Sequence, residues 1–476
     1  MKKSIFYILP AVLLLGACTK NITSYNIQTK KPAVVPAATL YTNATRNMSD
    51  QLASIGGGNI TLHIVGYMGQ AVIEDNAQYN FQTAGMPATH WNVLYRDVLN
   101  DLKASDTILS LTATTPATAA TIANQRACVD VTAVYAWYVL VTSFGNIPYS
   151  EALNPDNLFP KYDDQKTIVT DLLKRLDNDL SNLSTAGSGF AVSEDLWYGG
   201  NIANWITFTN SLKVLIGMTL ADVDPATSKS VVEAAIPNAI SSTAQNAIMK
   251  YGSQPSNNPT YQAFVVAHRT DYIATKPFMD QLLSNADPRL PSFFGLNGAG
   301  KYIGAPLGVQ TTFTTVSGPS TKDSASNLSY VVLDYSEMEF LRAEAIARGY
   351  NVAGTVESHY NEGIRQNIKY WGGADSSVTR YLADPSVAFT TATGTDIQKI
   401  ARQKWISLYM HPYDEWVDMR RLDYPVLPAP VGAVSGFPNR LYYPQTEQTL
   451  NPTNYTQAAS AVGGDKVETK LFWDKN

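Results

Sequence analysis

Residues 412–425 read PYDEWVDMRRLDYP, and they combine four carboxylates, two arginines and two kinds of aromatic ring. In a helix, Trp416 and Arg420 lie one turn apart on the same face, and Asp418 reaches the next turn. Catalytic carboxylates need an open cleft. Acids and bases that alternate around a tryptophan are typical of a partly buried network, because a buried charge without a partner is costly. The spacing therefore favours a structural role for this stretch over an active site.

The N-terminus predicts an exported lipoprotein. The chain opens MKKSIFYILPAVLLLGACTK, in which two lysines precede an apolar run. This run is shorter than the roughly 20 residues that span a bilayer, so it indicates an export signal. Its end, LGAC at 15–18, matches the bacterial lipobox. We predict a signal peptide at 1–17 and a mature protein held to a membrane by acyl chains such as palmitate on Cys18, because two or more chains anchor stably. The alternative is an ordinary signal peptide with a chance cysteine.

Charge and cysteine content exclude some classes of protein. The chain has 35 Lys and Arg against 40 Asp and Glu, a formal net charge of −5. Loss of 1–17 removes two lysines and no acid, which makes the charge −7. An acidic protein with scattered basic residues is a poor match for nucleic-acid binding. After acylation of Cys18, Cys128 is the one remaining cysteine, so no intrachain disulfide can form. Its apolar neighbours predict a buried side chain.

The mature chain is predicted to form one domain. About 460 residues follow the signal, the whole chain is 45% hydrophobic, and no low-complexity stretch divides it. Residues 18–40 are polar and then rich in Pro and Ala, which predicts a flexible tether before a domain at 41–476.

The domain is predicted to be mostly α-helical. In 165–183 the apolar residues recur every three or four positions, which indicates an amphipathic helix. Residues 127–143 are apolar nearly all round but too short to span a membrane, which predicts a buried core helix. Further helices are predicted at 91–110, 201–221, 331–349, 355–370 and 395–410. Strand signals are weak, and GNITLHIV at 58–65 is the example.

Long irregular stretches separate these helices. They cover 184–200, 222–228, 250–262, 286–329, 372–394 and nearly everything after 425. Loops of this length are uncommon in compact domains and tend to carry function. The pattern predicts helix pairs with large loops that face a ligand.

No catalytic or metal-binding motif is complete. GLNGAGK at 295–301 resembles a phosphate-binding loop, but Tyr302 stands where a small hydroxyl is needed, and the following residues are broken by Gly and Pro. The five histidines lack metal-ligand spacing, and there is no GxSxG nucleophile motif. Acidic pairs at 74–75 and 163–164 fit a glycosidase in principle, but solvated faces explain them. The sequence thus indicates no metal and no cofactor, and it leaves a role for calcium open.

Four stretches follow one another along the chain in a recognisable order. They are FGNIPYSEAL (144–153), ADPRLPSFF (286–294), FLRAEAIARG with HYNEGIRQNIKYWG (340–349 and 359–372), and QKWISLYMHPYDEWVDMRRLDYP with NRLYYPQTEQTLNPTNY (403–425 and 439–455). Together with the lipobox, they resemble the SusD/RagB family of SusD-like nutrient-binding outer-membrane lipoproteins over nearly the whole chain. The first stretch departs from the family in carrying Asn146 where Asp is usual.

This resemblance implies a fold and a function. The fold is a single SusD-like domain built on tetratricopeptide-like helix pairs with large irregular loops. The function is non-catalytic: a cell-surface lipoprotein of the outer membrane captures a nutrient and delivers it to a SusC-like TonB-dependent transporter. An oligosaccharide is the preferred ligand and a peptide the alternative. The resemblance also implies a framework role for Trp416, Asp418, Arg420 and Arg421. Surface-exported members of the family often carry acidic residues just after the lipidated cysteine, and here none follows Cys18 closely. Which leaflet of the outer membrane holds the anchor therefore stays open.

Capture of a glycan needs flat aromatic faces and polar groups for the hydroxyls. The stretch EDNAQYNFQTAGMPATHW (74–91) lies on the side that contributes to the ligand face in the family. The predicted ligand contacts are Asp75, Tyr79, Phe81 and Trp91 from this stretch, and Tyr302 from the Gly-rich loop. Ordinary packing is the alternative for each, most of all for Trp91.

The rival function is a surface lipoprotein glycoside hydrolase. It would need two carboxylates that face one cleft about 5–10 Å apart. No spacing in the sequence indicates such a pair, so a binding protein is the preferred interpretation.

Overall fold

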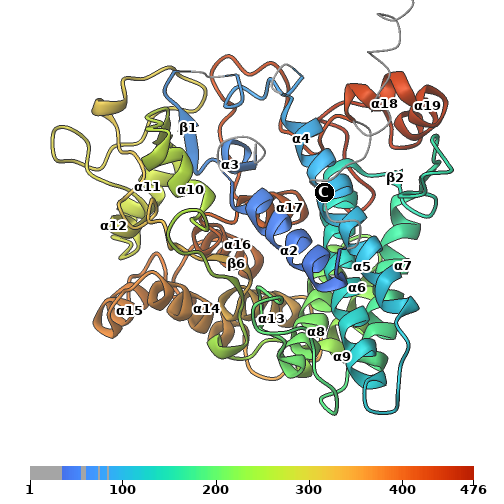
Figure 1. Cartoon of the computed structure of the whole chain (residues 1–476). Coiled ribbons are helices and arrows are strands. Elements are labelled where there is room, and N and C mark those ends of the chain that lie inside the picture. Colours follow the sequence, from blue (N-terminus) through green and yellow to red (C-terminus); the bar gives the residue numbers. More distant parts are fainter. Residues whose placement is uncertain (1–34, 55–60, 73–74, 83–84, 476) are drawn as a thin grey trace, which may run out of the picture. The chain divides into compact units, whose positions relative to one another are not determined.

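The computed structural model describes residues 35–54, 61–72, 75–82 and 85–475 (Figure 1). The predicted signal peptide, Cys18 and most of the predicted tether lie outside these residues. Helix α2 (Ala37–Ala53) begins inside the stretch 18–40, so the folded domain starts four residues before the predicted boundary. The reason is an apolar stripe in which Tyr41, Ala44 and Met48 recur at helical spacing and are fully buried.

The first group of helices packs in sequence order. Helix α4 (Met86–Asn92), the π-helix η2 (Val93–Leu99) and α5 (Asn100–Leu111) continue into one another. They are followed by α6 (Ala119–Phe144), α7 (Gln165–Asn182), α8 (Ile202–Thr219) and α9 (Pro225–Ala235). Each of α5 to α8 packs on the next, and Figure 1 shows the five gathered on one side of α2. This succession of helix pairs is the arrangement that the sequence predicted.

Helix α6 is the core of this group. It is long and apolar enough to cross a membrane, but 94% of its most apolar window is buried inside the protein. A helix that is apolar all round needs such surroundings. The prediction of a buried core helix at 127–143 is therefore confirmed, and Cys128 is buried within it.

A second group of helices lies in the C-terminal half. It consists of α13 (Tyr335–Ala347), α14 (Val356–Tyr370), α15 (Asp375–Leu382), α16 (Asp396–Ser407) and α17 (Pro412–Leu422). Helix α13 packs on α14 and α16, and α16 packs on α17. The α13–α14 contact is close: a Cβ on Gly363 would lie 2.9 Å from the Phe340 ring. These two helices form the pair predicted from 340–349 and 359–372.

The remaining elements are short. The helices are α3 (Thr61–Ile64), α10 (Pro259–Tyr261), the π-helix η5 (Gln262–Val266), α11 (Lys276–Ser284), α12 (Leu290–Phe293), α18 (Gln445–Leu450) and α19 (Pro452–Ala461). Single 3₁₀ turns are η3 (Ile236–Asn238), η4 (Thr243–Gln245) and η6 (Phe313–Thr315). Three antiparallel strand pairs join β1 (Met68–Gln70) to β5 (Tyr272–Ala274), β2 (Ile147–Pro148) to β3 (Tyr162–Asp163), and β4 (Ala247–Met249) to β6 (Tyr330–Leu333).

Some predicted elements are wrong. In the stretch 58–65, residues 61–64 form helix α3 instead of a strand, and all four are buried, so the alternation of a half-buried strand is missing. The helix predicted at 331–349 starts later, because 331–333 belong to β6 and the Asp334 side chain caps the helix by accepting from the backbone N–H of Glu337. Stretches predicted as loops also contain helix: α9 begins in one of them, and α10, α12, α15, α18 and α19 lie within others.

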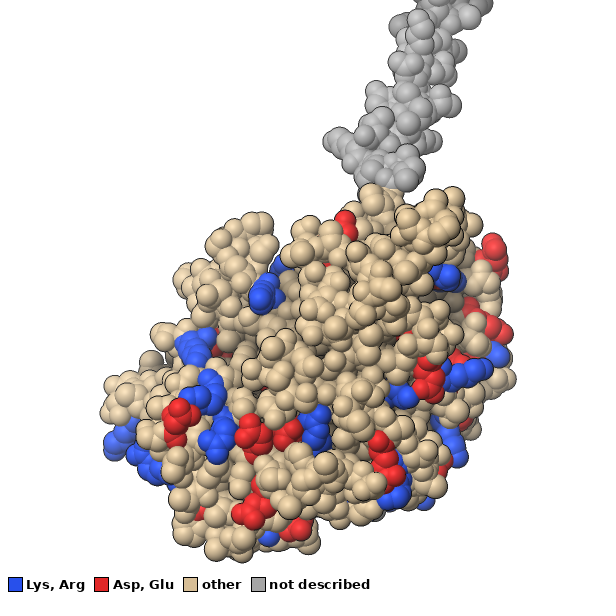
Figure 2. All heavy atoms as spheres, turned by 90° about the horizontal axis from the view of Figure 1, so that it is seen from below, with Lys and Arg blue, Asp and Glu red and all other residues tan. Residues whose placement is uncertain are grey.

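Surface charges are mixed in sign. On the face that Figure 2 shows, Lys and Arg side chains are interspersed with Asp and Glu. Exposed ion pairs also occur, such as Lys276 with Asp280, 2.6 Å apart. Interspersed charges attract no polyanion strongly.

Candidate functional site

Helix α17 carries most of the charged stretch 412–425, and the side chains of residues 412–421 are buried. Lys404 on α16 places its Nζ 2.6 Å from Asp418 Oδ2 and 3.2 Å from Glu337 Oε1 on α13. Arg421 donates to Glu344 on α13, with an Nη2–Oε2 distance of 2.7 Å, and to Asp418 Oδ1 at 2.7 Å. These ion pairs connect α13, α16 and α17 inside the protein.

The second arginine joins α17 to α6 and to the C-terminus. The Arg420 guanidinium lies 3.6 Å from the centroid of the Trp416 ring and 4.7 Å from that of Trp473. Its Nη1 donates to the carbonyls of Thr142 and Asn439, at 2.7 and 2.9 Å. Burial lowers the pKa of Arg420 to about 10. Arg420 is 2% exposed, and these contacts hold α17 against α6 and the C-terminal residues, which describes a packing role.

Two further acids of α17 are kept neutral. Burial, together with the charges of Glu337 and Asp418, raises the pKa of both Asp414 and Glu415 well above the usual range. The cavity lined by Asp414, Asp418 and Arg421 measures about 10 Å³, which is room for one water at most. No substrate fits there, so this density of charge is not an active site.

The aromatic residues predicted to contact ligand are mostly covered. Tyr79, Phe81 and Trp91 are 4%, 1% and 5% exposed. The rings of Tyr79 and Phe81 pack 6.0 Å apart, and Trp91 packs edge-on against Phe144 at 5.0 Å. A sugar cannot stack on a ring that other side chains cover. In this structure the rings of Tyr79, Phe81 and Trp91 are used for packing, the alternative considered for each of them, and their contact with a ligand stays a prediction.

The other two predicted contacts, Asp75 and Tyr302, are at least partly accessible to solvent. Asp75 is exposed and its Oδ1 accepts from Asn80 Nδ2 at 3.3 Å. Tyr302 is half-buried and packs against the main core. Neither residue lines the groove described next.

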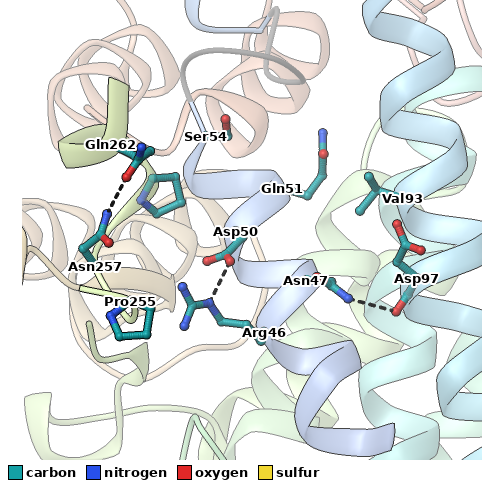
Figure 3. Close-up of a pocket in the computed structure, with 11 residues that line it drawn as sticks. Arg46, Asn47, Asp50, Gln51, Ser54, Val93, Asp97, Pro255, Asn257 and Gln262 are labelled. Carbon is teal, nitrogen blue, oxygen red and sulfur yellow. Dashed lines mark hydrogen bonds and ion pairs between the residues drawn. The ribbon is translucent and has the colours of Figure 1, made fainter. Parts of the chain in front are cut away.

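A polar groove of about 440 Å³ lies between α2, η2 and the loop that leads into α10 (Figure 3). Its lining residues are Arg46, Asn47, Asp50, Gln51 and Ser54 from α2 and its end, Val93 and Asp97 from η2, and Pro255, Asn257, Pro259 and Gln262. Both π-helices of the described chain border it, since Gln262 is the first residue of η5. π-helical turns are rare and occur frequently at functional sites.

The helical walls of the groove carry preorganised polar groups. Arg46 Nε lies 2.7 Å from Asp50 Oδ2, and the Tyr251 hydroxyl donates to Asp50 Oδ1 at 2.6 Å. The Arg46 guanidinium also lies 5.1 Å from the centroid of the Tyr251 ring. Asn47 Nδ2, also on α2, donates to the carbonyl of Asp97 on the facing wall at 3.4 Å. Figure 3 shows the Arg46–Asp50 pair on α2 and Asn47 bonded to Asp97 across to η2.

The loop wall is fixed by one buried amide. Asn258 is 2% exposed, its Nδ2 donates to the carbonyl of Leu328 at 2.6 Å, and its Oδ1 accepts from the Thr260 backbone N–H at 2.7 Å. This cap starts α10 and thereby holds Asn257 and Pro259 on the groove. Their neighbours Pro255 and Gln262 complete a wall of amide and apolar groups.

This arrangement is suited to binding. Amides, carboxylates and a guanidinium offer donors and acceptors to hydroxyl or amide groups, and proline and valine offer apolar contact. Asp50 is held by Arg46 and Tyr251, and Asp97 is held by the adjacent Arg96 at 2.7 Å, so both groove acids are already ion-paired.

Comparison with known proteins gives the family. A sequence profile of SusD-like proteins, described as "Starch-binding associating with outer membrane", matches residues 29–444. The chain belongs to the SusD-like family. The predicted family membership is therefore confirmed.

Solved structures of SusD-like proteins share the fold. A chitin-binding protein is 24% identical, with 92% of this chain and 100% of that chain covered and a TM-score of 0.79. A SusD homologue from Bacteroides thetaiotaomicron is 22% identical over 93% and 100% of the chains, with a TM-score of 0.78. A chitin-binding SusD homologue from Flavobacterium johnsoniae is 22% identical over 93% and 98%, with a TM-score of 0.76. The search of curated proteins found no match. The mostly α-helical SusD-like fold predicted from the sequence is thus confirmed.

The sequence pointed to only part of the groove. The stretch 250–262 was predicted as a long loop of functional type, and it forms one wall. Helix α2 was not predicted, because the stretch around it is rich in Thr, Asn and Ser, which are weak helix formers. The apolar stripe of Tyr41, Ala44 and Met48 is the sequence pattern that could have predicted this helix.

Proposed function

We propose that this SusD-like protein is a non-catalytic, lipid-anchored protein of the outer membrane that captures a glycan at the cell surface. It passes the glycan to a SusC-like TonB-dependent transporter. The observation that carries the proposal is the polar groove between α2, η2 and the 255–262 loop, in a chain whose family is described as starch-binding. Two structurally similar proteins are described as chitin-binding, which supports a glycan as the ligand.

The chemistry of the groove favours an uncharged, hydroxyl-rich ligand. Amide groups such as Asn257 and Gln262 both donate and accept hydrogen bonds, as sugar hydroxyls do. The lining residues include no aromatic ring, so stacking on a sugar face does not contribute here. Affinity then rests on several hydrogen bonds of about 0.5–1.5 kcal/mol each. Moderate affinity suits a protein that must release its ligand to a partner.

A binding experiment tests the groove. The purified mature protein is titrated calorimetrically with chito-oligosaccharides, malto-oligosaccharides and a panel of short peptides. We expect binding of one glycan class, and we expect the double variant Asn257→Ala with Gln262→Ala to lose about tenfold in affinity, because two hydrogen bonds are removed. Gln457→Ala, on the exposed face of α19, is the matched control and should bind like the wild type.

Three results would contradict parts of the proposal. Equal affinity of the double variant and the wild type would place the ligand elsewhere. Binding of peptides alone would keep a capture function but replace its ligand. New reducing ends after incubation with a bound glycan would show a glycoside hydrolase. Co-purification with an outer-membrane transporter from detergent-solubilised membranes tests the partner.

A further inference from the structure

One residue outside the lining of the groove contacts both members of its ion pair. Tyr251 is 7% exposed and lies two residues after β4, which pairs with β6 inside the domain. Its hydroxyl donates to Asp50 Oδ1 at 2.6 Å, and its ring centroid lies 5.1 Å from the Arg46 guanidinium. Because the strand pair and not α2 sets the position of this ring, Tyr251 fixes the Arg46–Asp50 pair from a separate part of the fold.

Asp50 connects Tyr251 to Arg46. Its Oδ1 accepts from the Tyr251 hydroxyl, and its Oδ2 accepts from Arg46 Nε at 2.7 Å. Burial and the charge of Asp50 raise the pKa of Tyr251 far above its usual range, so the hydroxyl keeps its proton and stays a donor at neutral pH. Both carboxylate oxygens therefore have a donor within the protein, and Asp50 is better suited to holding Arg46 than to contacting a ligand.

Arg46 still has donors to offer to a ligand. Its Nε is bonded to Asp50, whereas Nη1 and Nη2 form no hydrogen bond with any residue that the structure describes. The side chain is 27% exposed and lines the groove (Figure 3). The terminal N–H groups of a guanidinium lie in one plane and match two neighbouring oxygen atoms. Adjacent hydroxyl groups of a sugar ring present two such oxygens.

The fixed position of Arg46 matters for affinity. An arginine side chain has many rotamers, and a ligand that must freeze a freely moving side chain binds more weakly. The hydrogen bond to Asp50 and the contact with the Tyr251 ring remove much of this freedom before a ligand arrives. The Arg46–Asp50 pair is also neutral as a whole, so it favours uncharged oxygen atoms over a carboxylate.

We infer that Arg46 donates through Nη1 and Nη2 to two neighbouring oxygen atoms of a bound sugar, and that Tyr251 is a positioning residue that holds Arg46 for this contact through Asp50. The inference rests on the proposed function, because it requires a glycan in the groove. It names the residue that orients the glycan, and it gives Tyr251 an effect on affinity without contact with the ligand.

A double-mutant cycle tests whether Tyr251 acts through Arg46. Binding of chitotriose and of maltotriose to the purified mature protein is measured by calorimetry for the wild type, Arg46→Met, Tyr251→Phe and the double variant. For the oligosaccharide that binds, we expect Arg46→Met to lose about tenfold in affinity, and Tyr251→Phe, which keeps the ring, to lose about three- to tenfold. In the Arg46→Met background Tyr251→Phe should have no further effect, because the side chain that it positions is gone.

Tyr455→Phe is the matched control. The Tyr455 hydroxyl donates to Asp465 Oδ2 at 3.1 Å, and Arg440 Nη1 donates to Oδ1 of the same carboxylate at 2.9 Å, so the arrangement resembles that of Tyr251 but lies outside the groove. Each tyrosine variant loses one hydrogen bond to an aspartate. We expect similar, small changes in the melting temperature of the two variants, and a loss of affinity in Tyr251→Phe alone.

The inference fails if Tyr251→Phe or Arg46→Met binds like the wild type, if Tyr251→Phe weakens binding equally in both backgrounds, or if Tyr455→Phe weakens it as much. The double variant Asn257→Ala with Gln262→Ala separates this failure from that of the proposed function. If this variant weakens binding and Tyr251→Phe does not, the groove stands and the inference fails. If neither weakens binding, or if the wild type binds no glycan, the proposed function fails together with the inference.

Discussion

Replacing Arg421 by methionine tests whether the charged network of α17 is structural. Arg421 is 3% exposed and binds Glu344 and Asp418, which are themselves buried. Methionine keeps most of the apolar volume but leaves two carboxylates with fewer partners. Removing one member of a buried ion pair typically costs about 3–5 kcal/mol. Glu344 keeps Arg348, at 2.7 Å, and so we expect the lower end of this range.

The pKa of Glu344 indicates a stabilisation of the same magnitude. Burial by itself raises the pKa of Glu344, but the charges of Arg421 and Arg348 outweigh it and lower that pKa from 4.5 to about 2. A shift of this size corresponds to roughly 3 kcal/mol of stability. Because the folded pKa is depressed, this stability is present above pH 4.5 and is lost as the pH falls toward 2. In Arg421→Met the acid-dependent loss between these values should be smaller.

The assay is urea unfolding of the mature protein followed by tryptophan fluorescence, with the free energy of unfolding extrapolated to water. We expect Arg421→Met to lose about 3 kcal/mol at pH 7. Arg46→Met is the matched control: its pair with Asp50 is about one-quarter to one-third exposed, and such pairs contribute about 0–1 kcal/mol. A loss below about 1 kcal/mol in Arg421→Met would refute the structural interpretation. A stable Arg421→Met variant that no longer binds glycan would assign α17 to the binding site instead.

Four further predictions concern other parts of the chain. Glu415→Gln should be more stable than the wild type at pH 8, because the raised folded pKa of Glu415 means that the wild type loses stability as this acid ionises. This advantage should shrink by about 1.4 kcal/mol for each unit by which the pH falls, and vanish near pH 4. A difference in the free energy of unfolding between variant and wild type that stays constant with pH would contradict this prediction. Gly363→Ala should lower the free energy of unfolding by about 1–3 kcal/mol, because the new methyl group meets the Phe340 ring, although alanine has the better helix propensity. An unchanged melting temperature would show that α13 and α14 move apart easily. Tyr79→Ala should lower the melting temperature strongly, as a buried ring does and an exposed ligand contact does not. Cys18→Ser should move the protein from the detergent phase to the aqueous phase on partition, and retention in the detergent phase would contradict acylation at this residue.

Periodicity and short motifs determined much of the architecture. The stripe in 165–183 predicted α7, and the uniformly apolar 127–143 predicted the core of α6, because the side of a helix that is buried is fixed by spacing within a few turns. The order of four motifs carried the family resemblance and with it the fold. Short elements failed: 61–64 is helix and 331–333 is strand, since a few residues carry too little pattern to outweigh their surroundings.

The candidate site was decided by tertiary structure. Its walls come from 46–54, 93–97 and 255–262, and nothing in any one of these stretches shows that the others face it. The same holds for exposure: Tyr79 and Trp91 have the chemistry of ligand contacts, but packing partners distant in sequence cover them.

The sequence by itself therefore determined the longest helices, such as α6 and α7, the family, and the expectation of a lipid anchor. Only the tertiary structure decided which polar groups face solvent, which are paired inside the core, and where a groove opens. The physical reason is that helix formation depends on neighbours along the chain, whereas burial and charge pairing depend on neighbours in space.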